Sequence, residues 1–440
     1  MTRGVRTVGI GVVAAIAALS GCSLITDSFV TNEFSGDEFP IYVDTSSGAL
    51  RVGLRQDGAA DRTAILDVLS PLTLVDPGPG AVPSLSTVSL TLLGAESPGG
   101  PATIPRAMLT DSQVLSQHPC DEGVAPCVVG PPSAPLDYSA IIGADALAGD
   151  AVRLRLGDDR IFVLADIGGD EVHRTRACDG VFGSPYRGGG TLLVGGTELS
   201  FGGRRIAVAA CLGDNPSPDL PQGYRGADTL FVMSTSIGPS LIGESAYRRY
   251  VAAYKPCDTK DPACRPPPAL ETLTPDTVNL PSGPVDGLRV SIPHLALVAS
   301  NSSNPRAACR QVYASHFLLQ RNCMPTDADC PCDDASFCGA PAILHLEPTT
   351  GIEFLVVPDA NDTLQALRTE LRPNQAEVDG ILGTSAMKTA EIDVDYPHNR
   401  LLARCTSLDD GCVTRPQITD SIDREQGRGC LKNAPPGPVF

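Results

Sequence analysis

The sequence predicts an all-β protein whose body consists of two β-barrel-like lobes of similar design. A pair of short motifs occurs twice in the same order, at 64–75 with 141–145 and again at 231–242 with 381–385. Gly and Pro are frequent, with 44 and 39 residues, and aromatic residues make up only 5%. That composition is typical of many short strands joined by turns. A chain of 440 residues is also long enough to divide into two domains.

The first motif of each pair is an apolar strand followed by a polar loop. Ala64–Val75 reads AILDVLSPLTLV, and Phe231–Ile242 reads FVMSTSIGPSLI. Apolar residues lead into the loop at the same offset in both copies. A hydroxyl residue followed by two apolar residues ends both copies. Ser234 therefore stands at the position that Asp67 holds in the first copy.

The second motif is an apolar strand that ends in Gly. Ser139–Leu147 reads SAIIGADAL, and Val378–Ser385 reads VDGILGTS. Together the motifs resemble the Asp-Thr-Gly-Ser loop and the apolar-apolar-Gly strand of pepsin-like and retropepsin-like aspartic proteases. A repeat of both elements in one order is much harder to obtain by chance than either element alone. The resemblance covers residues 38–412 and implies a two-lobed pepsin-like (acid protease) fold, with an N-terminal lobe at 38–185 and a C-terminal lobe at 186–412.

The resemblance also implies which residues would carry chemistry. In that family two carboxylates about 3 Å apart, one from each lobe, share a proton and activate a water. Asp67 is thus the candidate catalytic residue, as a vestige of that activity, and Ser234 occupies the degenerate partner position. A serine hydroxyl is too weakly acidic to replace the second carboxyl group at ordinary pH.

Two further positions depart from the family's loop. Leu69 stands where the family has Gly, and its branched side chain is expected to crowd the place where the two loops approach. Val68 lacks the family's threonine hydroxyl, so only Thr235 is left to link the loops through such a group.

A second Asp-Thr segment competes with Asp67 for the catalytic position. Asp44-Thr45-Ser46-Ser47 is closer in letters to the family's motif. However, the family requires strand pairs before its catalytic loop, and we expect strands at 39–43, 50–54 and 63–66. These strands lead to Asp67 and leave Asp44 in a turn, where its side chain hydrogen-bonds its own backbone.

The second lobe is expected to begin like the first. Strands at 191–194 and 206–210 flank a Gly-rich hairpin at 195–205, and a strand at 229–233 leads to Ser234. Two strands are expected to close each lobe, at 152–156 and 161–164 in the first and at 390–394 and 401–404 in the second.

Three Pro-, Gly- or Cys-rich insertions, at 96–135, 256–285 and 309–338, are expected to be surface loops held by disulfides. The chain has 15 cysteines, and setting Cys22 aside leaves an even number, compatible with full pairing in an oxidising compartment. The spacing suggests the pairs Cys120–Cys127, Cys257–Cys264 and Cys178–Cys211.

No cofactor or metal is predicted. Acids and cysteines between Asp327 and Cys338 have ligand types suited to zinc or calcium, but in an exported chain a disulfide-bonded loop is favoured. No signature of a haem, zinc-protease, serine-hydrolase or phosphate-loop protein occurs.

The N-terminus predicts export. Arg3 and Arg6 precede a short apolar run, Val8–Ala18, which Leu19-Ser20-Gly21-Cys22 follows. This pattern resembles the lipobox of bacterial lipoproteins, with residues 1–21 as the signal peptide. The apolar run is too short for a transmembrane helix.

The lipobox implies a lipid anchor. Cleavage before Cys22 would leave its thiol diacylated and its amino group acylated, so several acyl chains would hold the protein on a membrane. Residues 22–37 would form the lipidated tether. Ser23 favours the outer membrane as the membrane that holds the anchor, at its periplasmic face or at the cell surface. At the other end of the chain, residues 413–440 form a polar tail.

A net charge of −18 argues against nucleic acid as a partner. The predicted function is a membrane-anchored lipoprotein with a non-catalytic aspartic-protease-like body that binds a peptide, a protein or another envelope component. One alternative is an active envelope endopeptidase that pairs Asp67 with Asp228 or with Asp67 of a second molecule. Another is a structural surface lipoprotein. The oligomeric state is left open.

Overall fold

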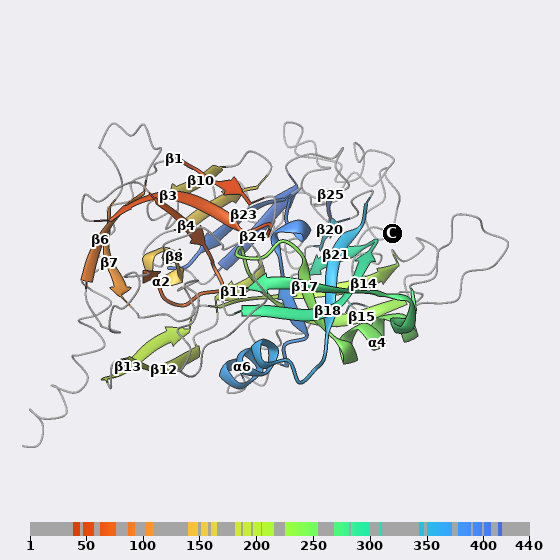
Figure 1. Cartoon of the computed structure of the whole chain (residues 1–440). Coiled ribbons are helices and arrows are strands. Elements are labelled where there is room, and N and C mark those ends of the chain that lie inside the picture. Colours follow the sequence, from red (N-terminus) through yellow and green to blue (C-terminus); the bar gives the residue numbers. More distant parts are fainter. Residues whose placement is uncertain are drawn as a thin grey trace, which may run out of the picture.

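The computed structural model confirms an all-β architecture with a few short helices (Figure 1). The structure describes residues 38–44, 47–56, 62–75, 87–92, 103–109, 140–147, 151–156, 160–164, 181–185, 188–194, 197–203, 205–214, 225–253, 268–280, 283–298, 309, 343–346, 350–371, 377–388, 390–397, 400–405 and 412–415. The predicted signal peptide, Cys22 and the tether lie outside these residues.

Lobe one is a seven-stranded sheet in the order β2-β3-β4-β8-β5-β7-β6, in which β3 also pairs with β6. Its elements are β2 (Tyr42–Val43), β3 (Leu50–Gln56), β4 (Arg62–Leu66), β5 (Leu74–Val75), β6 (Thr87–Leu92), β7 (Thr103–Leu109), β8 (Ala140–Ile142) and the helix α2 (Ala144–Leu147). Leu50, Val52 and Leu54 of β3 are buried, whereas Arg51 and Gly53 are half-buried. This alternation turns one face of the strand to the core.

Lobe two contains the strand order β14-β15-β22-β16-β21-β18-β17. Its strands are β14 (Ile206–Asp214), β15 (Arg225–Met233), β16 (Ser240–Gly243), β17 (Thr274–Leu280), β18 (Gly283–Ile292), β19 (Leu295–Val298), β20 (Ile343–Leu346), β21 (Ile352–Val357), β22 (Gly380–Leu382) and β25 (Cys412–Arg415). Its helices are α4 (Glu244–Ala253), η2 (Leu270–Thr272), α6 (Asp362–Leu371) and η5 (Thr384–Ala386). Strand β19 extends the sheet from β14, followed by β20 and β25.

The same strand arrangement occurs in both lobes. The order β3-β4-β8-β5-β7 in lobe one matches β14-β15-β22-β16-β21 in lobe two. In each lobe the four successive pairings are antiparallel, parallel, antiparallel and parallel. The motif repeat of the sequence is therefore a repeat of a structural unit, and the predicted two-lobed pepsin-like fold is confirmed.

A third group of strands joins the lobes in the order β1-β10-β9-β23-β24-β11. Its members are β1 (Glu38–Pro40), β9 (Ala151–Arg155), β10 (Arg160–Leu164), β11 (Val181–Pro185), β23 (Ala390–Asp395) and β24 (Arg400–Cys405). The four strands expected to close the lobes are present, but they do not close each lobe separately. Instead β9 pairs with β23 across the repeat.

Several strands pair differently from what the sequence predicts. The strand at 191–194 belongs to β12 (Gly188–Val194), whose one partner among the described strands is β13 (Thr197–Gly203). Strand β11 takes the place beside β14. Two insertions expected to be loops contain strands, because β7 pairs with β5 and β17 pairs with β18. Each of these strands finds backbone partners that its sequence does not reveal.

The predicted Cys178–Cys211 disulfide is wrong, because Cys211 of β14 is bonded to Cys309. The other suggested pairs, Cys120–Cys127 and Cys257–Cys264, lie outside the described residues, as does the segment from Asp327 to Cys338. In the part of the chain that the structure describes, no helix is both long and apolar enough to cross a membrane.

One large hydrophobic cluster includes residues of both lobes and of the joining strands. It contains residues of lobe one such as Leu66, residues of the joining strands such as Ile392, and residues of lobe two such as Phe231 and Phe354. The rings of these two phenylalanines pack with centroids 5.8 Å apart. A core that crosses from one lobe to the other fixes the ends of β4 and β15 against each other.

Candidate functional site

The structure brings the two predicted site residues together. Asp67 directly follows β4, and its N–H donates to the carbonyl of Ile142 at 2.9 Å. Ser234 directly follows β15, and its N–H donates to the carbonyl of Leu382 at the same distance. Between the two residues, Ser234 Oγ donates to Asp67 Oδ1 at 3.0 Å. The repeated strands therefore place one carboxylate and one hydroxyl at equivalent positions.

Asp67 is buried, with 5% of its surface exposed. Its Oδ1 also accepts hydrogen bonds from the backbone N–H groups of Leu69, at 3.0 Å, and Thr235, at 3.3 Å. Burial raises the pKa of the Asp67 carboxyl, and the hydrogen bonds from Leu69, Ser236, Ser234 and Thr235 only partly oppose that rise. The described groups that bond to this carboxylate are hydroxyls and amides.

Ser236 extends this network on the side of lobe two. Its hydroxyl lies 2.9 Å from Ser234 Oγ, and its N–H donates to the same atom at 3.2 Å. All three side chains, Asp67, Ser234 and Ser236, are buried. The network therefore holds the Ser234 hydroxyl in place and leaves little of it exposed to solvent.

Thr235 links the two loops. Its Oγ1 donates to the carbonyl of Leu66 at 2.6 Å and accepts from the N–H of Val68 at 3.1 Å. Val68 occupies the matching position in lobe one and has no hydroxyl to return these bonds. This threonine link between the loops therefore comes from lobe two alone.

Leu69 is partly buried, and its side chain packs against two hydrophobic clusters of lobe two. One cluster includes Ile237 and the other includes Leu230. The carbonyl of Leu69 accepts a hydrogen bond from Arg205 Nη1 at 2.6 Å. Arg205 is itself held by Glu370, whose Oε2 lies 2.7 Å from Arg205 Nε. Leu69 therefore contacts lobe two through both its side chain and its carbonyl, and these contacts fasten its loop to that lobe.

Matching polar contacts support both loops from behind. In lobe one Thr73 Oγ1 accepts from Gly143 N–H at 3.0 Å, and in lobe two Ser240 Oγ accepts from Gly383 N–H at 3.0 Å. Thr73 also donates to Asp145 Oδ1 at 2.7 Å. These pairs lie at equivalent positions of the sequence repeat.

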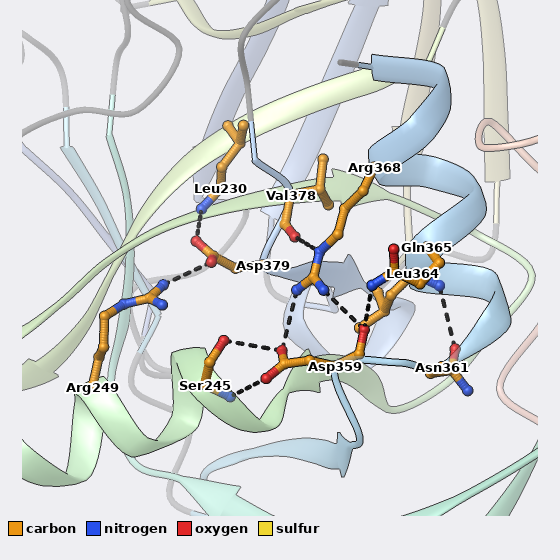
Figure 2. Close-up of polar contacts among 10 residues, drawn as sticks. All are labelled: Leu230, Ser245, Arg249, Asp359, Asn361, Leu364, Gln365, Arg368, Val378 and Asp379. Atoms are coloured by element: carbon orange, nitrogen blue, oxygen red, sulfur yellow. Dashed lines mark hydrogen bonds and ion pairs between the residues drawn. The ribbon is translucent and has the colours of Figure 1, made fainter.

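Lobe two has an additional buried acid behind the Ser234 loop, drawn in Figure 2. Asp379 Oδ2 accepts from Leu230 N–H at 3.0 Å, and its Oδ1 accepts from Arg249 of α4 at 2.7 Å. Nearby, Arg368 of α6 donates to the carbonyl of Val378 at 2.8 Å. Asp379 is 2% exposed, and these bonds fix β15, β22 and the two helices relative to one another.

The competing acids lie elsewhere. Asp44 sits in a turn, where its Oδ1 accepts from Ser47 N–H at 3.3 Å and its carboxylate pairs with Arg51. Asp228 is on β15 opposite Cys211 and accepts from Cys309 N–H at 3.1 Å. Ser234 lies six positions further along the chain than Asp228, which is about 20 Å in an extended strand. Asp228 therefore does not serve as the second acid beside Asp67.

Sequence reasoning missed Arg205 and Arg249, which hold the site from lobe two. Arg205 contacts a loop 136 residues away, and Arg249 contacts an acid 130 residues away, so no local pattern reveals either contact. Among the described residues, no group of three His, Cys, Asp or Glu side chains is arranged to hold a metal ion.

No protein-family model matches the sequence, and no curated protein matches it. Among solved structures the chain is similar to basic 7S globulin from soybean (10% identity, TM-score 0.40, over 85% of this chain and 95% of that one). It is also similar to conglutin gamma, a basic 7S globulin from lupine seeds (9%, 0.39, 85% and 96%), and to an aspartic proteinase from Irpex lacteus (12%, 0.33, 84% and 97%). These likenesses are weak, and the duplicated strand order carries the assignment of the fold.

The strand order and the site together define a pepsin-like body with a carboxylate from one lobe and a serine from the other where its lobes meet. Activating a water between two carboxyl groups requires both groups. The pair of Asp67 and Ser234 supplies one carboxyl group, that of Asp67.

Proposed function

We propose that this chain is a lipid-anchored bacterial lipoprotein with a non-catalytic, aspartic-protease-like body that binds a peptide, a protein or another envelope component. The observation that carries the proposal is the 3.0 Å hydrogen bond from Ser234 Oγ to Asp67 Oδ1. Ser234 stands where proteolysis needs a second carboxyl group. During the reaction that group alternately takes up and releases a proton. A serine hydroxyl does neither at ordinary pH.

The surroundings of Asp67 support the same proposal. Attack by water requires room beside the carboxylate, whereas Leu69 packs across the junction and Asp67 is 5% exposed. Pairing Asp67 with Asp67 of a second molecule would require the lobes of both molecules to separate first. The endopeptidase alternative is therefore disfavoured, and binding is the function left to this body.

The anchor is proposed from the lipobox alone. Acyl chains on Cys22 would hold the protein at the outer membrane, with residues 23–37 as a spacer, because several chains together make release slow. Growth with an alkyne-labelled palmitate tests this directly. We expect the full chain to be labelled and the Cys22→Ser variant to remain unlabelled. Equal labelling of both would refute anchoring at this residue.

Binding is tested with soluble residues 23–440 immobilised against a displayed pool of random peptides, with the reduced and unfolded chain as control. We expect the folded chain alone to enrich peptides that share a sequence pattern. Enrichment of no pattern, or of the same pattern by the unfolded control, would refute peptide binding and favour a structural surface lipoprotein.

A further inference from the structure

We infer that residues 47–50 of lobe one form a latch that fastens the two lobes and closes the Ser234 loop to any added peptide strand. This inference goes beyond the proposed function, because it concerns which backbone groups of the loop are already used inside the molecule. It gives a role to the Asp44 turn, which the site chemistry leaves unexplained.

The latch pairs with lobe two in the manner of a strand. Leu50 N–H donates to the carbonyl of Thr235 at 2.8 Å, and Gly238 N–H donates to the carbonyl of Ser47 at 2.7 Å. Donors and acceptors therefore alternate between the two segments, as they do between antiparallel strands. A third bond runs from Thr384 Oγ1 to the carbonyl of Gly48 at 2.7 Å.

Two glycines allow the backbones to touch. Gly48 has a φ of +71°, and a Cβ atom on it would lie 2.2 Å from the Cα of Gly238. A Cβ atom on Gly238 would lie 2.8 Å from the carbonyl oxygen of Ser47. Both distances are too short for a methyl group. No peptide chain fits between segments packed this closely.

Lobe one holds the latch in shape. Gly48 N–H donates to the carbonyl of Asp44 at 2.6 Å, and Asp44 N–H donates to the carbonyl of Ala49 at 2.9 Å. The Asp44 carboxylate accepts from Ser47 N–H and pairs with Arg51. The turn is thus formed by lobe one's own contacts, and its backbone groups that point to lobe two are presented ready for pairing.

The latch affects whether a peptide strand can pair with the Ser234 loop. A peptide that adds a strand to a protein needs free N–H and C=O groups on the edge it joins. The Thr235 carbonyl and the Gly238 N–H flank the Ser234 loop, and the latch uses both. A ligand strand can pair with this loop only after the latch opens.

Hydrogen exchange of the amides at positions 50 and 238 tests the latch in the folded chain, residues 23–440. Thr384→Val removes one interlobe hydrogen bond from a buried threonine. Thr229→Val is the matched control, since Thr229 is equally buried and donates to the Ala210 carbonyl at 2.8 Å within lobe two. We expect Thr384→Val to speed exchange at both amides about two- to tenfold, and Thr229→Val to leave them unchanged.

A stronger perturbation is Gly48→Ala, which we expect to speed exchange at both amides at least about tenfold. Its matched control is Gly351→Ala, because Gly351 has a φ of +73° and the atoms nearest to an added Cβ belong to Ser291 and Ile292 of lobe two. Unchanged exchange at positions 50 and 238 in Thr384→Val, or equal acceleration by Thr229→Val, would overturn the latch. This outcome can be read even if Gly48→Ala does not fold.

Discussion

Asp67 is a buried acid, and its ionisation affects the stability of the fold. Burial raises the pKa of its carboxyl, so the folded chain binds this proton more tightly than the unfolded chain does. The stability that the protonated group contributes is fully present below the ordinary pKa of 3.8 and is lost as pH rises through the raised pKa of the folded state.

The Asp67→Asn variant should therefore be more stable than the parent chain at neutral pH, because it removes a buried ionisable group and keeps an oxygen acceptor. We expect this gain to shrink as the pH falls towards 3.8. Urea unfolding over that pH range measures it. Asp286→Asn, at an exposed carboxylate bonded to Thr277, controls for the loss of one acid. A neutral-pH stability of Asp67→Asn below that of the parent would contradict the expectation.

Ser234→Asp should have the opposite effect on stability. It places a second carboxyl group within hydrogen-bond reach of Asp67, and two like charges at such a distance do not both ionise. We expect this variant to be less stable than the parent at neutral pH and to recover in acid, as measured by thermal unfolding. A loss of stability that is the same at all pH values would show instead that the new side chain simply does not fit.

At the residue scale the sequence predicts the paired positions well, because Asp67 and Ser234 lie at equal offsets in a repeat. It also predicts that Thr235 offers the threonine hydroxyl that Val68 lacks, and in the structure this hydroxyl bonds to Leu66 and Val68. It does not predict that Leu69 is accommodated by clusters in lobe two. Such packing depends on residues distant in sequence, and periodicity carries no information about them.

At the element scale, β9 and β23 join the lobes through ion pairs whose carboxylates are buried. Arg153 Nε and Nη2 donate to the two carboxylate oxygens of Asp393 at 2.6 and 2.7 Å, and Arg155 pairs with Glu391. Burial opposes the charged form of Arg153, but the adjacent carboxylates outweigh it and raise the pKa of Arg153. Each strand supplies charges of one sign, so the pairing of β9 with β23 brings opposite charges together.

Arg153→Met should lower the free energy of unfolding by about 3–5 kcal/mol, because it removes the guanidinium that bonds both oxygens of the buried Asp393 carboxylate. The double variant Arg153→Met with Asp393→Leu removes both charges and should regain most of that loss. Urea unfolding of the parent, the single variant and the double variant measures both effects. A double variant no more stable than the single one would show that the loss comes from packing.

Helix α4 offers a matched pair of arginines for a second comparison. Arg249 pairs with the buried Asp379, whereas Arg248 pairs with Glu244 on the helix surface. Because the Arg249 side chain is 45% exposed, solvent weakens its pair, and we expect Arg249→Met to cost about 1–2 kcal/mol. Arg248→Met should cost less than about 0.5 kcal/mol. Equal costs in chemical unfolding would show that Asp379 does not depend on Arg249.

The strands of the repeat were predicted where an apolar run ends in a recognisable loop. The sequence does not predict the pairing of β9 with β23, since each strand looks like the closing strand of its own lobe. Strands β7 and β17 were also missed, because Pro and Gly around them indicate loops, while their backbone partners lie in other segments. Local composition predicts turns reliably, but it does not show which edges remain open for pairing.

At the scale of the whole molecule, duplication explains both the fold and the site. Two copies of one strand arrangement bring equivalent loops face to face, and the joining strands and a shared core keep them there. The sequence repeat predicts this architecture because both motifs recur in order. The contacts that lock the lobes, from Leu69 to lobe two and from the latch to Gly238, depend on the meeting of the two copies and become visible only in three dimensions.

The central claim is that the lobes meet without the pair of carboxyl groups that proteolysis requires. The most direct test incubates soluble residues 23–440 with a diverse peptide pool from acid to neutral pH, beside the Asp67→Asn variant. We predict no cleavage by either protein at any pH. Cleavage by the parent chain that disappears in Asp67→Asn would contradict the account, because it would show that a second acid acts with Asp67.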